Sequence, residues 1–182
     1  INPQAKINIV ERFYNAETSD ELLAMGADFV LDAIDNLTAK AHLISKAREK
    51  SLRLISALGA AARLDPQALQ FADLAETHTD PLAHQLRKTL RSRHDFPEDG
   101  PWGISAVFST EKPILPHDLK YDKGQGFRCV CPQGQNDFHS CERRNVIYGT
   151  ASFVTGSMGL LMSSWVVRQV VAAPVIETAS PE

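Results

Sequence analysis

Apolar and polar residues alternate in short blocks along the first third of the chain, and each block has the length of a strand or a helix. A continuous apolar run at residues 29–31 is followed by a helical pattern over 37–50 and by a second apolar run over 52–57. Upstream, residues 6–10 have the pattern of a strand, and residues 18–26 contain a helix cap signal and a terminating glycine. The order strand, helix, strand, helix, strand predicts a parallel sheet with right-handed crossovers.

The middle of the chain predicts a change to antiparallel strands. Residues 69–74 have strand-like content, and residues 104–109 form a further apolar strand. Between them, Asp80 and Pro81 are typical of the start of a helix. The leucines expected on the packed face of this helix are Leu82, Leu86 and Leu90.

The most apolar stretch lies over residues 149–171. Its length is close to the roughly 20 apolar residues that cross a membrane, but hydroxyl residues and glycines dilute it. We therefore expect a long helix, buried as it crosses the sheet, and no stable association with a membrane. Residues 116–148 are polar and weakly periodic, which predicts a long irregular segment, and we expect the tail at 177–182 to be disordered.

Composition and charge favour an ordinary globular protein. The chain has 182 residues, of which 43% are hydrophobic and 23% charged, as in one domain with a sizeable core. A formal net charge of -3 argues against a strongly basic nucleic-acid-binding protein but is compatible with a local basic patch. Three cysteines do not make a disulfide framework, so a reducing compartment is the default expectation.

The first candidate site is the acidic sequence that follows the apolar run at 29–31. Asp32 and Asp35 come at the end of a predicted parallel strand, where open α/β sheets bind their ligands. A carboxylate there can hold Mg²⁺ or accept hydrogen bonds from a ribose. The alternative is structural: Asp32 accepts hydrogen bonds from nearby backbone amides, and Asp35 or Asn36 caps the next helix.

The second candidate site is a basic patch on the helix that begins at Asp80-Pro81. Its basic residues lie away from the leucine stripe and are Arg87, Lys88, Arg91 and Arg93. Such charges are most often a solvated helix face, and the functional alternative is contact with the phosphates of a nucleic acid.

The third candidate site is a group of metal-binding residue types in the irregular segment, namely Cys129, Cys131, His139 and Cys141. Three thiolates and an imidazole can complete a tetrahedral zinc site. The Cys-x-Cys spacing, however, differs from the Cys-x-x-Cys of structural zinc sites. The alternatives are three reduced thiols in a loop, or a nucleophilic Cys141 with a depressed pKa.

A set of longer motifs carries a family resemblance. The motifs are Asp32-Ala-Ile-Asp35-Asn36 with Lys40, Asp65-Pro66 with Asp73-Leu74, Asp80-Pro81-Leu82-Ala83 with Leu86-Arg87, Val107-Phe108-Ser109-Thr110-Glu111, and Gly149-Thr-Ala-Ser-Phe-Val-Thr-Gly156. Together they resemble the tRNA threonylcarbamoyladenosine dehydratases of the ThiF/MoeB/HesA superfamily of adenylating enzymes, which includes the ubiquitin-activating enzymes. The Asp-x-x-Asp-Asn element is shared across the superfamily, whereas the Asp-Pro-Leu-Ala helix and the Phe-Ser-Thr-Glu strand indicate the dehydratase branch.

The resemblance implies a Rossmann-like adenylating fold in one domain over residues 1–176. It also implies an ATP-dependent, Mg²⁺-dependent and ligase-like reaction on cytoplasmic tRNA, in which the carboxylate of N6-threonylcarbamoyladenosine is adenylated and the ring closes with loss of AMP. By motif matching, Asp35 lies near ATP and Mg²⁺, Asn36 lies beside it, Lys40 matches a family position, and Asp32 supports the loop. Superfamily members are commonly homodimers.

One departure from the family is large. The superfamily binds ATP with a glycine-rich loop after its first strand, and no G-x-G-x-x-G occurs in this chain. The chain also begins with Ile1 and not with methionine. We therefore expect the domain to be incomplete at its amino-terminal end and the isolated chain to be weak or inactive in ATP-dependent turnover.

Two alternatives remain open from the sequence. One is an adenylyltransferase that activates a sulfur-carrier or ubiquitin-like protein, although such enzymes usually carry two Cys-x-x-Cys pairs and this chain has none. The other is a non-catalytic module retained for RNA binding or dimerisation.

Overall fold

The computed structural model describes residues 2–115 and 148–172. Its sheet has four strands in the order β1-β2-β4-β3, where β1 is Phe29–Asp32, β2 is Arg53–Ala57, β3 is Leu69–Asp73 and β4 is Ser105–Ser109. β1 pairs with β2 and β2 with β4 in parallel, whereas β3 pairs with β4 antiparallel. The predicted change from parallel to antiparallel pairing is confirmed.

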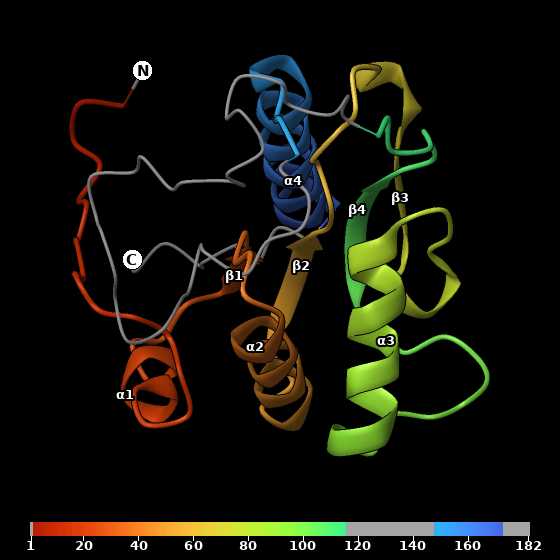
Figure 1. Ribbon diagram of the computed structural model, residues 1–182. Helices are drawn as coiled ribbons and strands as arrows, with labels where there is room; N and C mark the ends of the chain where they lie inside the picture. Colours follow the sequence, from red (N-terminus) through yellow and green to blue (C-terminus); the bar gives the residue numbers. More distant parts are fainter. Residues whose placement is uncertain (1, 116–147, 173–182) are drawn as a thin grey trace, which may run out of the picture.

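Helices cover both faces of the sheet. Helices α2 (Leu37–Glu49) and α3 (Pro81–His94) pack on one face, and α4 (Ser152–Ala172) packs on the other (Figure 1). The short helix α1 (Ser19–Leu23) precedes β1, and the 3-10 turns η1 (Pro66–Ala68) and η2 (Leu74–Glu76) flank β3. The arrangement is a Rossmann-like α/β/α sandwich.

Alternation along the central strands divides the core into two clusters. Successive strand residues point to opposite faces, so Leu54 and Phe108 join the core under α2 and α3, whereas Ile55 and Val107 face α4. The α4 side is completed by Met158 and Met162. Because apolar residues of β2 and β4 point alternately to the two faces, the sheet is buried on both sides at these strands.

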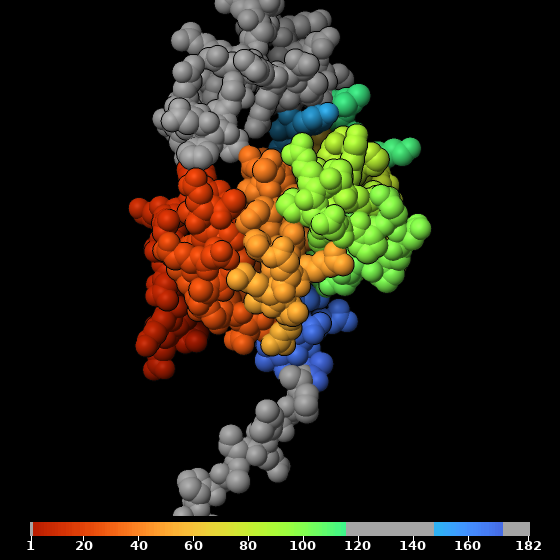
Figure 2. Space-filling view, turned by 90° about the horizontal axis from the view of Figure 1, so that it is seen from below, coloured from red at the N-terminus to blue at the C-terminus, as the bar shows by residue number. Residues whose placement is uncertain are grey.

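Helix α4 is only half buried, which corrects the expectation of a buried helix. One face packs Val154, Met158 and Met162 against the sheet, while on the opposite face Leu160 is 74% and Val171 77% exposed. The carboxyl-terminal end of α4 is visible at the surface in Figure 2. None of the helices in the described residues combines the length and hydropathy that a bilayer crossing requires.

The predicted strand at residues 6–10 is wrong. This segment is irregular, and Ile7 and Ile9 are 82% and 81% exposed. A strand needs a neighbour to accept its ladder hydrogen bonds, and no described strand pairs with this segment. Among residues 2–115 and 148–172, the segment therefore pairs with neither edge strand of the sheet, β1 or β3.

Candidate functional site

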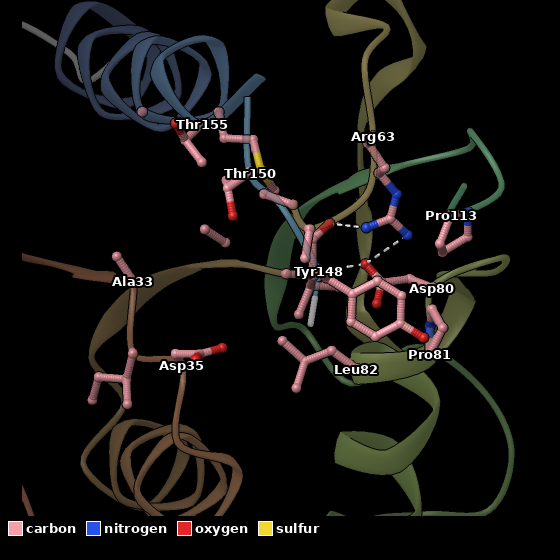
Figure 3. A pocket seen from close by; sticks show the side chains of 18 of the residues that line it. Ala33, Asp35, Arg63, Asp80, Pro81, Leu82, Pro113, Tyr148, Thr150 and Thr155 are labelled. Carbon is pink, nitrogen blue, oxygen red and sulfur yellow. Dashed lines mark hydrogen bonds and ion pairs between the residues drawn. The ribbon is translucent and has the colours of Figure 1, made fainter. Parts of the chain in front are cut away.

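A cavity of about 710 Å³ lies at the carboxyl ends of β1 and β2. Its walls include residues 33–35 after β1, residues 57–61 at and after the end of β2, Arg63, residues 80–82 at the start of α3, and the first half of α4. Figure 3 shows these segments facing one another across the cavity. The location agrees with the expectation that a ligand binds where parallel strands end.

Three helices begin at the wall of this cavity. Helix α2 starts just after the wall residue Asp35, α3 starts at the wall residue Pro81, and α4 starts between the wall residues Thr150 and Thr155. Helix N-termini carry partial positive charge and present backbone N–H groups. The cavity is therefore suited to an anionic ligand.

Asp32 lies beneath the loop that carries Asp35 and is fully buried. Its Oδ1 accepts a hydrogen bond from the Ile34 amide at 2.9 Å, and its Oδ2 accepts one from Ser56 Oγ at 2.7 Å. Lys40 Nζ lies 2.7 Å from the same Oδ2 and donates to the Ile34 carbonyl at 3.0 Å. Through these contacts Asp32 supports the loop, as expected from the sequence.

Lys40 lies behind the cavity wall, as Asp32 does. Its side chain is wholly buried and is not part of the cavity wall. Since its ammonium group holds Asp32 and the Ile34 carbonyl, Lys40 positions the loop from behind. Its local sequence, a lysine in the first turn of a helix, gave no signal of this burial.

The sequence left open whether Asp35 or Asn36 caps the next helix, and the structure shows that Asn36 does. Asn36 caps α2, because its side chain accepts a hydrogen bond from the Ala39 amide at 2.9 Å. Asp35 is exposed at the cavity wall, and Figure 3 shows its carboxylate beside the cavity. Within residues 2–115 and 148–172, no hydrogen bond or ion pair is found for this carboxylate, which leaves it available to a metal ion.

A buried charged cluster that sequence reasoning did not identify lies across the cavity. Arg63 and Asp80 both belong to the wall and are 1% and 3% exposed. Asp80 accepts hydrogen bonds from the amides of Ala83 at 3.0 Å and Gly59 at 2.9 Å. The capping half of this arrangement was predicted from Asp80-Pro81, whereas the only local signal for Arg63 was a charged residue in a run of small ones.

Glycine is favoured at position 59 by the close approach of this cluster. A Cβ atom there would lie 3.0 Å from Asp80 Oδ1 and 3.1 Å from Arg63 Nη1. Both distances are shorter than ordinary van der Waals contacts, and both neighbours are buried. The absence of a side chain at Gly59 lets the loop after β2 pass directly over the buried charges.

Two side chains of the predicted basic patch are engaged by neighbouring residues, and the other two have no ion pair with a described residue. Arg87 donates to Thr77 Oγ1, and burial lowers the pKa of its guanidinium below the ordinary value, with neighbouring Arg91 acting in the same direction. Arg91 lies over the Trp102 ring and donates to the Glu98 carbonyl at 3.0 Å. The two remaining cations, Lys88 and Arg93, are exposed and have no ion pair with a described residue.

The predicted zinc ligands Cys129, Cys131, His139 and Cys141 lie outside the described residues. Among the residues that are described, no group of three or more His, Cys, Asp or Glu side chains is placed to hold a metal ion. As far as these residues go, a metal at Asp35 would need most of its ligands from a bound molecule and from water.

Comparisons with known proteins agree with this geometry. The model of the ThiF family matches residues 1–180. The tRNA threonylcarbamoyladenosine dehydratase of Bacillus subtilis is 32% identical over 168 residues, which are 92% of this chain and 60% of that protein. The dehydratase of Haemophilus influenzae is 38% identical over 118 residues, or 64% of this chain and 45% of that protein.

Solved structures show the same likeness. The crystal structure of the Escherichia coli dehydratase in complex with ATP aligns with a TM-score of 0.73 and 28% identity, over 94% of this chain and 59% of that one. Its complex with AMP aligns with a TM-score of 0.74 and 29% identity, over 94% and 59%. The chain thus spans about three-fifths of the length of the Bacillus subtilis and Escherichia coli proteins.

Proposed function

Because this chain belongs to the ThiF family, we propose that its full-length gene product is a tRNA threonylcarbamoyladenosine dehydratase. It closes the ring of N6-threonylcarbamoyladenosine in tRNA at the expense of ATP, in the cytoplasm. The observation that carries the proposal is the carboxylate of Asp35, which has no hydrogen bond or ion pair with a described residue and lies beside a cavity at whose wall three helices begin. The names of the relatives supply the substrate class.

The residues present fit ATP and Mg²⁺. Mg²⁺ is commonly bound through one or two carboxylates together with substrate phosphates and water, and Asp35 supplies one such carboxylate. Phosphate groups favour helix N-termini, and the starts of α2, α3 and α4 lie at the cavity wall. Asp35 would hold the metal, and the backbone amides of these helices would stabilise the phosphates.

ATP supplies the leaving group that the substrate carboxylate lacks. In the proposed reaction an oxygen of this carboxylate bonds to the α-phosphorus as pyrophosphate leaves. Ring closure by the neighbouring carbamoyl group then releases AMP and a proton. Within this chain, Asp32 and Lys40 keep the Asp35 loop in place through their buried ion pair. Groups that are held in place before the reaction stabilise the transition state most where charge develops.

Contact with tRNA is assigned to the exposed cations of α3. Lys88 and Arg93 have no ion pair with a described residue and are free to meet phosphates. Arg87 and Arg91 are already engaged with Thr77, Glu98 and the Trp102 ring, so we expect them to contribute less.

A homodimer is the expected assembly. The outer face of α4 exposes Phe153, Leu160, Val167 and Val171, and exposed apolar surface of this kind favours association. Light scattering of Leu160→Glu beside the wild-type protein tests this assignment: a dimer that persists in the variant would place the interface elsewhere.

The proposed reaction is tested by ATP–pyrophosphate exchange with the full-length gene product, with either tRNA carrying the threonylcarbamoyl group or a carrier protein ending in Gly-Gly. We expect stimulation by the tRNA alone. Asp35→Asn should lower the exchange rate on the order of 10²-fold without loss of folding, because the Asp35 side chain is exposed. Asp28→Asn, at the exposed residue just before β1, is the matched control and should leave the exchange rate unchanged.

Two outcomes would contradict the proposal. Stimulation by the carrier protein and not by tRNA would assign the chain to the sulfur-carrier adenylyltransferases. An Asp35→Asn protein as active as the wild type would remove Asp35 from the nucleotide site.

A further inference from the structure

Arg63 is a buried arginine whose hydrogen bonds are incomplete. Its Nε donates to the Glu111 carbonyl at 3.2 Å, and its Nη1 donates to the Gly59 carbonyl. Its Nη2 has no hydrogen-bond partner among the described residues. A buried donor left without a partner is costly, and native proteins rarely retain one.

The nearby carboxylate of Asp80 does not complete the hydrogen bonds of Arg63. Asp80 Oδ2 lies 3.5 Å from Arg63 Nη2, without a hydrogen bond between them. A structural arginine–carboxylate pair is typically bidentate and shorter. The two oxygens of Asp80 are instead satisfied by the amides of Gly59 and Ala83. Asp80 therefore balances the charge of Arg63 while Nη2 is left to another acceptor.

The position of Arg63 indicates where that acceptor comes from. Its side chain forms part of the cavity wall, and Figure 3 shows it on the opposite side of the cavity from Asp35. The same cavity receives the N-termini of α3 and α4. An oxyanion bound in the cavity would supply the missing acceptor.

Two oxyanions of the proposed reaction qualify, a phosphate of the nucleotide and the carboxylate of the substrate. Asp35 is the group assigned to the metal and its phosphates, and Arg63 lies across the cavity from it. We propose that Arg63 is the residue that binds the substrate carboxylate and thereby selects an acidic side chain on the modified nucleoside. This inference rests on the proposed function.

The test measures binding of two anticodon stem-loop RNAs to the full-length gene product by fluorescence anisotropy. One RNA carries the threonylcarbamoyl group with its free carboxylate, and the other carries the corresponding carboxamide. Arg63→Met should weaken binding of the carboxylate RNA by about 10- to 100-fold, as expected for a hydrogen bond to a charged group. Binding of the carboxamide RNA, and of Mg²⁺-ATP by calorimetry, should stay within about twofold of the wild-type value.

Further variants separate binding from folding. Arg63→Lys keeps the charge without the planar fork and should fall between the wild type and Arg63→Met. If the single variant fails to fold because Asp80 loses its neighbouring charge, Arg63→Met/Asp80→Asn removes both charges and is tested in its place. Arg53→Met, an exposed arginine over the Phe29 ring, is the matched control and should affect neither RNA.

The outcomes are distinguishable. Loss of ATP affinity with unchanged RNA discrimination would overturn the inference and make Arg63 a phosphate ligand. Equal weakening of both RNAs, or of neither, would overturn it in favour of a structural role. A wild-type protein that does not prefer the carboxylate RNA would refute the proposed function itself, since that comparison involves no Arg63 variant.

Discussion

Replacing Asp32 with asparagine is expected to lower the free energy of unfolding by about 3–5 kcal/mol, the range for breaking one partner of a buried ion pair. Asparagine retains an oxygen for the Ile34 amide, but its NH₂ group would face two donors, Lys40 Nζ and Ser56 Oγ, now 2.7 Å from Asp32 Oδ2. The side chains of Asp32 and Lys40 are both 0% exposed, so water cannot compensate for the missing charge.

Urea unfolding followed by circular dichroism measures this effect. With a dependence of about 2 kcal/mol per molar urea, the midpoint should fall by roughly 1.5–2.5 M. Adding Lys40→Met to Asp32→Asn removes the stranded ammonium and should recover roughly half of the loss or more. Asp28→Asn, at the exposed residue just before β1, is the control, and its free energy of unfolding should stay within about 0.5 kcal/mol of the wild-type value.

Three results would refute this account of the Asp35 loop. A loss below about 1 kcal/mol in Asp32→Asn would mean that the pair contributes little, as exposed pairs do. An equal loss in Asp28→Asn would point to a general effect of charge. A double variant less stable than Asp32→Asn would show that Lys40 contributes through packing and not through its charge.

Other predictions concern separate parts of the molecule. Gly59→Ala should destabilise the protein by about 1–3 kcal/mol because its methyl group meets buried side chains. Gly156→Ala, with open space around it, should stabilise the protein by up to about 1 kcal/mol. Thermal unfolding measures both changes, and equal effects would contradict the packing argument. Burial lowers the pKa of His42 below its ordinary 6.5, so its contribution to stability is present above about pH 6.5 and is lost as the pH falls toward the lowered pKa. In His42→Gln the urea midpoints at pH 8 and pH 5 should therefore lie closer together than in the wild type. An unchanged difference would exclude His42 as a source of the pH dependence. Substituting Lys88 and Arg93 by alanine should reduce the salt dependence of tRNA binding by about one unit of slope for each phosphate that is no longer neutralised, and an unchanged slope would exclude α3 from the RNA surface.

Local patterns were sufficient to predict most elements of the fold. The apolar run that becomes β1 and the helix that becomes α2 follow from periodicity, and the caps at Asn36 and Asp80 follow from residue type. Such features depend on neighbours close in sequence. The position of Asp35 at the carboxyl end of β1 was predictable for the same reason.

The features that the sequence did not predict depend on distant contacts. Residues 6–10 have a strand pattern, but a strand forms only with a partner, and no described strand provides one. Helix α4 lies in the most apolar stretch of the chain, which predicts burial, yet the sheet covers one of its faces only. Arg63 is buried by residues far from it in sequence, such as Glu111, so nothing in its local sequence indicates its place at the cavity.

The single carboxylate of Asp80 joins two parts of the chain that are far apart in sequence. It accepts the amide of Ala83 in the first turn of α3 and the amide of Gly59 in the loop after β2. Rotation of this one side chain would expose both N–H groups in the same event. The two amide protons should therefore exchange with deuterium at correlated rates, and the start of α3 should open cooperatively with the loop that closes over Arg63.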